Sequence, residues 1–235
     1  MSRMAGGVGP AHPLAALPRV WWFPGLRGYR SGKRGTYLRN ELDDQPPVPG
    51  GDELSWLEDE AEKPEWNIAE GDPVRSVTPA GLEAIAGNLP VPSSLRLLAA
   101  RGDLQRRIRS ATACFLDLGD FAAATSGGGY LVHVLSDQQW CLHWLLYLDP
   151  AGNEAVVTST EPIGFDLPGD EAAPPRFISL DSEMMGLNVC ADTFAEFLYR
   201  FWIENEIFFA LGSNQPLTPA AAAYAARLPR TATRP

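Results

Sequence analysis

The sequence has only three cysteines in 235 residues, and none of them stands in a C-x-x-C pair. An odd count with this spacing excludes a disulfide framework and fits a reducing compartment. Cys114, Cys141 and Cys190 each have apolar neighbours, and a free cysteine in such a setting usually behaves as a small buried hydrophobic residue. We therefore expect all three cysteines to pack in the core.

Long apolar runs are also missing. A bilayer-spanning helix needs roughly 20 uninterrupted apolar residues, and charged residues such as Arg200 and Glu204 interrupt the longest candidate. Residues 14–17 are too short for the apolar part of a secretory signal, and Pro13 and Pro18 flank them. We expect a cytoplasmic protein with no membrane partner.

Catalytic and nucleotide-binding motifs are absent as well. The chain has no G-x-S-x-G, no H-E-x-x-H and no dinucleotide-binding glycine pattern. The glycines at 127–129 lead into a strand and lack a following Gly-Lys-Ser/Thr, so they predict a flexible connector and not a phosphate-binding loop. Beside His133 and His143 we find no acid that would orient either ring as a general base. The sequence gives no support for catalysis and predicts no cofactor.

Basic residues are in the minority, and both signs of charge are unevenly spread. The chain has 29 acidic and 19 basic residues and a formal net charge of -10, which argues against direct binding to nucleic acid. Residues 1–40 contain seven basic and no acidic side chains, whereas residues 41–72 contain twelve acidic and one basic. We expect residues 1–72 to form a Pro/Gly-rich, charged and partly ordered N-terminal appendage, residues 73–212 a domain, and residues 213–235 an Ala-rich short helix and tail.

Tryptophans in the appendage favour partial order, because disordered segments seldom contain many of them. The appendage has Trp21, Trp22, Trp56 and Trp66. We expect that its two charged blocks either pair with each other or fold over the domain with these rings as anchors.

Two short helices are expected at the start of the domain. Thr78 and Pro79 form an N-cap and a proline at the first helical position, and this helix ends at Gly87. A second helix follows Pro92 and ends at Arg101-Gly102. The arginines from 101 to 109 could bind an acidic ligand, but we expect a solvated face, as is usual for charged short helices.

The middle of the chain predicts an antiparallel sheet. Residues 112–118 have the composition of a strand, residues 130–135 and 139–148 that of a hairpin, and residues 154–159 that of a strand after the turn at 149–153. The strand within 139–148 is apolar on both faces, which indicates a central strand covered by helix on at least one face. The pattern is typical of an α+β fold with an antiparallel meander.

His133, Cys141 and His143 are of the residue types that bind zinc, so the register of the hairpin matters. A two-residue loop at Asp137-Gln138 places His133 on the opposite face from the other two, whereas a three-residue loop places all three on one face. We favour the two-residue loop, and neither register supplies a fourth ligand. We therefore expect no metal and histidines that are hydrogen-bonded within a half-buried sheet.

Residues 191–212 predict the longest helix. Thr193 and Glu196 have capping-box spacing, and seven apolar side chains, five of them phenylalanines, fall within one stripe of the helix. Asn205 lies inside that stripe and should be hydrogen-bonded, either to core backbone or to something bound. Ile203 and Ile207 on the opposite side predict a second apolar contact, with the appendage or with a partner.

The order of these elements resembles one known superfamily. Leu89-Pro90 precedes a Leu-rich helix, glycines 127–129 lead through Tyr130-Leu131 into the hairpin, the turn at 149–153 precedes Val156-Val157, and residues 191–198 begin the closing segment. In this order they are similar to the SUKH superfamily, typified by a yeast cell-wall-assembly regulator and by bacterial immunity proteins. The resemblance covers about residues 78–211. The chain differs in having Ala100-Arg101-Gly102-Asp103 where Asn-Gly is common, and in its long appendage.

The resemblance implies an α+β domain with a mainly antiparallel sheet packed by helices, and no catalytic residues. Bacterial members are implied to neutralise toxins, often nucleases or deaminases, by binding them. An acidic chain suits a basic partner of this kind. We expect a non-enzymatic, immunity-type protein with a protein partner. The alternatives are a regulatory or scaffolding module that binds through the appendage, and a small hydrolase or transferase with a site near the 130–148 hairpin.

Four polar residues are candidate partner contacts, since binding residues are often exposed on loops of a rigid scaffold. They are Asp137 and Gln138 at the hairpin tip, and Asp149 and Glu154 beside the next turn. Each could instead be a plain turn residue.

Overall fold

The structure is a computed structural model that describes residues 13–23, 26, 38–48, 54–70, 76–166, 177–180 and 186–228. Its helices are α1 (Pro79–Ala86), α2 (Ser93–Ala100), α3 (Gly102–Arg106), α4 (Phe194–Gly212) and α5 (Pro219–Arg227). Its strands are β1 (Val20–Phe23), β2 (Leu38–Glu41), β3 (Phe115–Leu116), β4 (Ala123–Thr125), β5 (Tyr130–Ser136), β6 (His143–Leu148), β7 (Glu154–Ser159), β8 (Phe177–Ile178) and β9 (Asn188–Ala191).

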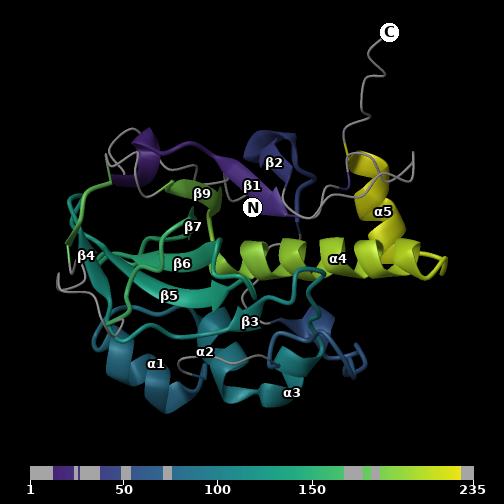
Figure 1. Cartoon of the computed structure of the whole chain (residues 1–235), viewed down its shortest axis with the longest axis horizontal. Helices are drawn as coiled ribbons and strands as arrows, with labels where there is room; N and C mark the ends of the chain where they lie inside the picture. The colour runs from purple at the N-terminus through teal and green to yellow at the C-terminus, as the bar shows by residue number, and fades with distance from the viewer. Residues whose placement is uncertain are drawn as a thin grey trace, which may run out of the picture.

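Seven strands form one sheet, which lies at the left of Figure 1, with α4 extending from it to the right. Its strand order is β8-β4-β5-β6-β7-β9, and β3 also pairs with β5. Every pairing is antiparallel except the parallel pair β4–β8. A second, small sheet consists of β1 and β2. The predicted α+β class, the mainly antiparallel sheet and the β5–β6–β7 meander are therefore confirmed.

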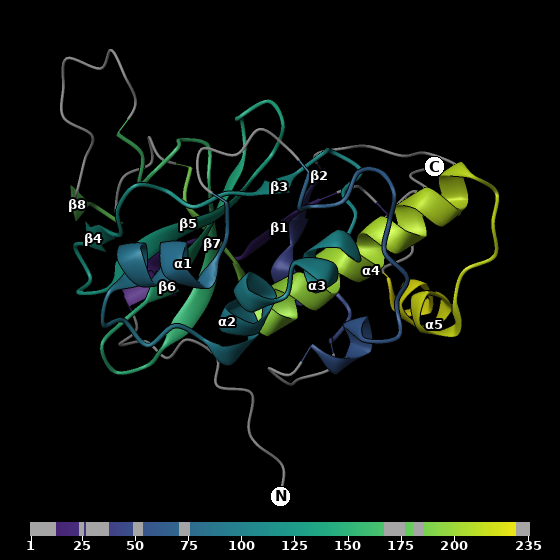
Figure 2. The ribbon, with the colours of Figure 1, turned by 90° about the horizontal axis from the view of Figure 1, so that it is seen from below.

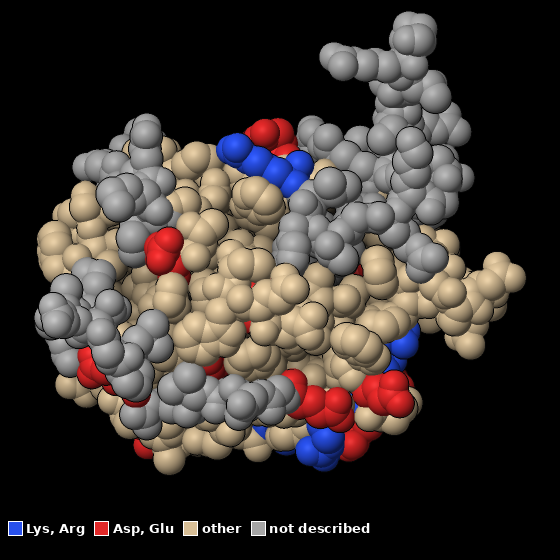
Figure 3. Space-filling view, in the orientation of Figure 1, with Lys and Arg blue, Asp and Glu red and all other residues tan. Residues whose placement is uncertain are grey.

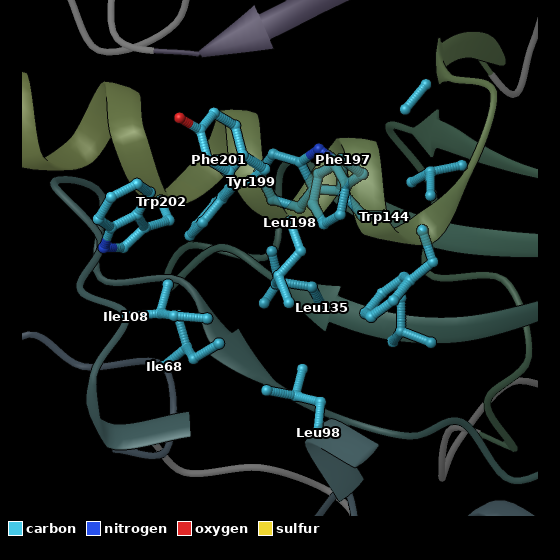
Figure 4. Packing of buried hydrophobic residues seen from close by; sticks show 14 of the residues in the cluster. Ile68, Leu98, Ile108, Leu135, Trp144, Phe197, Leu198, Tyr199, Phe201 and Trp202 are labelled. Carbon is cyan, nitrogen blue, oxygen red and sulfur yellow. The ribbon is translucent and has the colours of Figure 1, made fainter. Parts of the chain in front are cut away.

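The face of the sheet that includes Trp144 is covered by helix, as predicted. Ring centroids of Trp144 lie 6.2 Å from Phe197 and 6.1 Å from Phe201 of α4. Leu135 and Trp144 point from the sheet toward α4, and Leu98 of α2 lies on the far side of the same cluster (Figure 4). This packing fixes β5 and β6, and with them the loop that joins the two strands.

The opposite face of the sheet is covered by short segments. Leu14 and Leu17 from the N-terminal region join Ile163 and Leu180 against Tyr147 in a second buried cluster. These segments reach the sheet because the glycines before β5 leave room for them. A Cβ atom at Gly127 would collide with Pro13, and one at Gly129 with the ring of Tyr147. The predicted flexible connector is thus a place of close packing.

The predicted strand over 112–118 is wrong in its length, because only β3 is extended there. The Ser110 hydroxyl accepts hydrogen bonds from the Thr112 and Cys114 amides at 3.3 and 3.0 Å, and the Ala113 amide donates to the Ser110 carbonyl at 3.2 Å. These bonds fold residues 110–114 into a turn. Serine side chains often form such local hydrogen bonds to the backbone, which compete with the pairing of a strand.

Both predicted registers of the hairpin are also wrong. His133 pairs with Leu145 and Ser136 with His143, with a register shift between His133 and Leu135. The connecting loop spans residues 137–142. The shift places His133, Ser136 and His143 on one face, an arrangement that alternation along regular strands does not predict.

Helix α4 begins at Phe194, because Thr193 caps it by accepting a hydrogen bond from the Glu196 amide at 3.1 Å. Asn205 is fully buried and accepts from the Ala111 amide at 2.7 Å while donating to the Phe201 carbonyl at 2.8 Å, which confirms the predicted backbone partners. The opposite side of α4 is also buried, at Ile207 among other residues. Figure 2, seen from below, shows α2 and α3 in front of α4.

Residues 54–70 pack into the same core as the residues that follow 76. Ile68 is fully buried, and its backbone joins two later segments: its amide donates to the Ile108 carbonyl at 2.9 Å, and its carbonyl accepts from the Leu116 amide at 2.8 Å. Figure 4 shows Ile68 beside Ile108, on the far side of the cluster from α4. The acidic block therefore contributes apolar side chains to the core.

Arg101, Arg106 and Arg107 form ion pairs with acidic residues of that same segment, and the side chains of Arg101 and Arg106 stay partly exposed, so the expected solvated face is present but is also ion-paired. Arg106 pairs with Glu62 at 2.8 Å, and Arg101 with Glu58 at 3.2 Å and with Asp103 at 2.8 Å. The hydrogen bond from Arg101 lowers the pKa of Asp103 to about 2. These opposite charges gather beside α3 at the lower right of Figure 3. The sequence pattern showed the arginines but not their partners, which are about 40 residues away.

Two of the three cysteines are buried as expected. Burial raises the pKa of Cys114 to about 12 and that of Cys190 further. Cys141 is exposed, contrary to the prediction, because it lies in the hairpin loop. None of the helices in the described ranges combines the length and the apolar character needed to cross a membrane.

Candidate functional site

A cleft of about 660 Å³ lies between the segment 65–70, the turn 110–114 and the hairpin loop 137–142. It is lined by Glu65, Trp66, Asn67, Glu70, Ala113, Phe115, Gln138 and Trp140. Clefts of this size suit a small ligand or a few residues of a partner. Its walls combine aromatic rings with carboxylate and amide groups.

Trp66 is the most exposed aromatic side chain of the cleft, with 49% of its surface accessible. Its backbone is nevertheless anchored. The Trp66 carbonyl accepts a hydrogen bond from the Ser110 amide at 2.7 Å, and two residues later the Ile68 amide donates to the Ile108 carbonyl. The indole therefore projects to solvent from a fixed backbone.

Asn67 is buried and holds the carboxylate of Glu70 in place. Its Nδ2 donates to Glu70 Oε1 at 2.7 Å and to the Lys63 carbonyl at 3.0 Å, and its Oδ1 accepts from the Ala69 amide at 3.2 Å. Glu65 on the same segment is exposed. The cleft thus has two carboxylates, one of them positioned by a buried amide.

Two cations whose backbones contact that of the buried Asn67 or its side chain already have an acidic partner. Lys63 pairs with Glu206 at 3.2 Å, and Arg109 binds the same carboxylate through two hydrogen bonds of 2.9 Å. Among the residues that line the described cleft none is basic. The local charge of the cleft is therefore negative.

Left-handed backbone conformations are concentrated around this cleft. Trp66, Ala113 and Trp140 have φ values of 63°, 49° and 55°. Residues other than glycine seldom adopt such angles, and the strain is tolerated where surrounding structure enforces it, often at functional sites. Three walls of the cleft thus contain one strained residue each.

Asp137 shapes the hairpin loop that forms one of those walls. Its carboxylate is fully buried and accepts hydrogen bonds from the Cys141 amide at 2.8 Å, the Leu142 amide at 2.9 Å and the Gln139 amide at 3.3 Å. It also accepts from the Cys141 thiol at 3.3 Å. Partial burial and this carboxylate raise the pKa of Cys141, which keeps the thiol protonated.

Below the loop, His133, Ser136 and His143 form a buried hydrogen-bonded chain. His133 Nε2 lies 2.8 Å and His143 Nδ1 3.2 Å from the Ser136 hydroxyl, and His143 Nε2 lies 3.1 Å from the Trp140 carbonyl. A carbonyl can only accept, so His143 carries its proton on Nε2 and accepts from Ser136 at Nδ1. Ser136 then accepts from His133 Nε2. The expected hydrogen bonding of both histidines is confirmed.

This chain is closed to solvent. His133, Ser136 and His143 have no exposed surface, and the Phe165 ring packs 4.5 Å from His133. Burial lowers the pKa of both histidines, that of His133 strongly and with a further contribution from His143. The rings are neutral at pH 7. In the described part of the chain, no group of three or more His, Cys, Asp or Glu residues could hold a metal ion.

The four candidate contact residues have different surroundings. Gln138 is exposed and lines the cleft. The expected exposure of Asp137 is wrong, because the loop amides enclose its carboxylate. Asp149 accepts from the Ala151 and Asn153 amides within its turn. Glu154 accepts from the Phe194 amide at 3.2 Å, at the start of α4.

Sequence reasoning missed Glu65 and Glu70 and gave Trp66 the role of an anchor in the domain. The sequence offers one signal: a second apolar residue, Ile68, follows Trp66 two positions later, so either of the two could be the one that packs in the core. Ile68 is the residue that docks, and Trp66 points outward.

Comparisons of the chain with protein-family models, with curated proteins and with solved structures found no match.

Proposed function

We propose that this chain is a protein-binding protein of the immunity type, which neutralises a toxin by binding to it and not by catalysis. The cleft beside the hairpin loop is its docking surface. The observation that carries the proposal is Trp66, an indole that is 49% exposed on an anchored backbone. Large aromatic side chains on rigid backbone supply much of the binding energy of protein interfaces at a low entropic cost.

The charge of the molecule favours a basic partner. The chain has a net charge of -10, and Glu65 and Glu70 flank the exposed indole. Opposite charge speeds the encounter of two proteins and helps to exclude acidic competitors. The resemblance to the SUKH superfamily points to nuclease or deaminase toxins, which tend to be basic because they act on nucleic acid.

The enclosed position of the Ser136–histidine chain supports binding over catalysis at the hairpin. A serine between two histidines has the composition of a nucleophile with a base. Ser136 has no exposed surface, and the Trp140 and Phe165 rings pack 5.1 Å apart and against the histidine rings. The chain of hydrogen bonds instead holds β5, β6 and the Trp140 carbonyl together.

The experiment is co-expression with the protein encoded beside this chain. We expect a stoichiometric complex and restored growth of cells that produce the neighbouring protein. Trp66→Ala should weaken the complex at least about tenfold. Phe177→Ala is the matched control, because Phe177 is also exposed but lies on β8, outside the cleft.

Two results would contradict the proposal. Cells that are poisoned equally with and without the chain would overturn the immunity function. A complex that is equally tight with Trp66→Ala and Phe177→Ala would overturn the assignment of the docking surface.

A further inference from the structure

We propose that the cleft binds a single arginine side chain of the protein partner. Its guanidinium lies against the aromatic side chains of the cleft and pairs with Glu65 or Glu70. This inference rests on the proposed function and names the chemical group that the cleft recognises.

A cationic group is favoured by the balance of charge in the cleft. The lining contains two carboxylates and, among the described residues, no basic side chain. The Glu70 carboxylate is held by the buried Asn67 amide at 2.7 Å, so it is fixed before a ligand arrives. A preorganised carboxylate binds a cation with less loss of conformational entropy than a free side chain does.

The aromatic lining favours arginine over lysine. Three of the residues that line the cleft, Trp66, Phe115 and Trp140, are aromatic, and the Trp66 indole is the most exposed of them. A guanidinium is planar and weakly hydrated, so it stacks on an aromatic face while its N–H groups remain free to bind a carboxylate. An ammonium is a compact, strongly hydrated charge that gains less from such a surface.

A guanidinium, a carboxylate and an aromatic ring already interact in this way within the chain, directly beside the cleft. Arg109 binds Glu206 through two hydrogen bonds of 2.9 Å, and its guanidinium lies 4.2 Å from the centroid of the Phe209 ring. Arg109 also forms a backbone bridge with Asn67, which lines the cleft. One guanidinium, one carboxylate fork and one aromatic face therefore already form a stable unit in this fold.

The volume of the cleft agrees with this ligand. About 660 Å³ is more than one arginine side chain fills, so the cleft also accommodates backbone on either side of it. An arginine in an exposed loop of a partner fits this space, and Gln138 at the rim can hydrogen-bond to the adjoining peptide groups.

The experiment titrates the full-length chain with three capped tripeptides that differ only in the central residue: arginine, lysine or citrulline. Citrulline retains the planar shape and loses the charge. The readout is the NMR signals of the Trp66 and Trp140 indole N–H groups, assigned with Trp66→Phe and Trp140→Phe. We expect the arginine peptide to shift both signals and to bind most tightly, with lysine at least about threefold and citrulline at least about tenfold weaker.

A double variant that replaces both carboxylates with uncharged amides tests their contribution to binding. Glu65→Gln with Glu70→Gln should weaken arginine binding at least about tenfold. Glu83→Gln is the matched control, because Glu83 is an exposed carboxylate on α1 outside the cleft. Equal affinity for arginine and citrulline, or unchanged affinity in the double variant, would overturn the inference.

These results are separable from those that test the proposed function. If Trp66→Ala breaks the partner complex while arginine peptides fail to bind, the arginine assignment is wrong and the docking surface stands. If arginine peptides bind but Trp66→Ala leaves the affinity of the partner complex unchanged, the cleft is an arginine-binding site and its assignment as the docking surface is wrong.

Discussion

At the scale of single residues, Asp137 and Asp149 show how burial changes the role of a turn aspartate. Asp137 directly follows β5 and Asp149 directly follows β6, and each accepts hydrogen bonds from backbone amides. Asp137 is fully buried, whereas the amides that donate to Asp149 are exposed. Water can replace a lost acceptor at an exposed amide but not at a buried one.

We expect Asp137→Ala to lower the free energy of unfolding by about 1–3 kcal/mol, because the buried Leu142 amide loses its acceptor. The variant should also weaken arginine binding, since Asp137 shapes the loop that contains Gln138 and Trp140. Asp149→Ala should cost less than about 1 kcal/mol and leave arginine binding unchanged. Urea unfolding and the peptide titration measure both effects, and equal losses in the two variants would contradict this account.

The hairpin illustrates what a sequence can and cannot reveal about single residues. Runs of residues that favour strands predicted both strands, and apolar residues on both faces of the second run predicted its central place in the sheet. The register was missed because the shift between His133 and Leu135 and the loop around Asp137 depend on hydrogen bonds between specific atoms. The pairing of His133 with His143 through Ser136 followed from the shift and could not be predicted without it.

At the scale of elements, residues 54–70 act as a strap that joins α3, β3 and the cleft. Ile68 is bonded through its backbone to the Ile108 carbonyl and the Leu116 amide, and its side chain is fully buried. Ion pairs such as Arg106–Glu62 lie on the outer side, where both side chains are about half exposed. Exposed pairs contribute little to stability, so the apolar contacts hold the strap.

Truncation of Ile68 tests this view of the strap. Ile68→Ala should lower the free energy of unfolding by about 2–5 kcal/mol, the range for fully buried aliphatic side chains. Ile85→Ala on α1 is the matched control, because Ile85 is only half buried and should cost about 1 kcal/mol. Urea denaturation gives both values, and equal costs would show that residues 54–70 only rest on the surface.

Among the elements, α4 could be predicted closely from the sequence, whereas the contacts of the strap could not. The capping pair Thr193 and Glu196 and the phenylalanine stripe predicted α4 closely, because helical periodicity is a local signal. The strap has no regular period, and its partners at 101–110 lie about 40 residues away in the sequence. The cleft depends on the strap, so its position could not be derived from local patterns.

At the scale of the whole molecule, Glu204 connects the N-terminal and C-terminal parts of the described chain. This residue of α4 is almost fully buried, and it accepts a hydrogen bond from Trp21 Nε1 at 2.9 Å and one from the Tyr224 hydroxyl at 2.6 Å. Arg200, one turn earlier on α4, also acts on it electrostatically. Figure 1 shows β1 and α5 along the same side of α4, where these contacts lie.

Burial raises the pKa of Glu204 from its ordinary value of 4.5 to about 7, although Tyr224, Trp21 and Arg200 favour the ionised form. A folded-state pKa above the unfolded value means that the folded protein binds the proton more tightly. The stability that this provides is complete below about pH 4.5 and is lost as the pH rises through about 7. By linkage the full effect is about 3 kcal/mol.

Glu204→Gln isolates this contribution, because glutamine keeps an acceptor for Trp21 and a donor for the Tyr224 oxygen but does not ionise. The free energy of unfolding of the native chain, measured against that of Glu204→Gln by urea denaturation, should fall by about 2 kcal/mol between pH 5 and 8. Other titrating groups, including His133 and His143, are common to both proteins and cancel in the difference. A difference that is constant over this range would mean that Glu204 has the same pKa folded and unfolded. In that case the contacts of β1 and α5 with α4 would not depend on pH through this carboxylate.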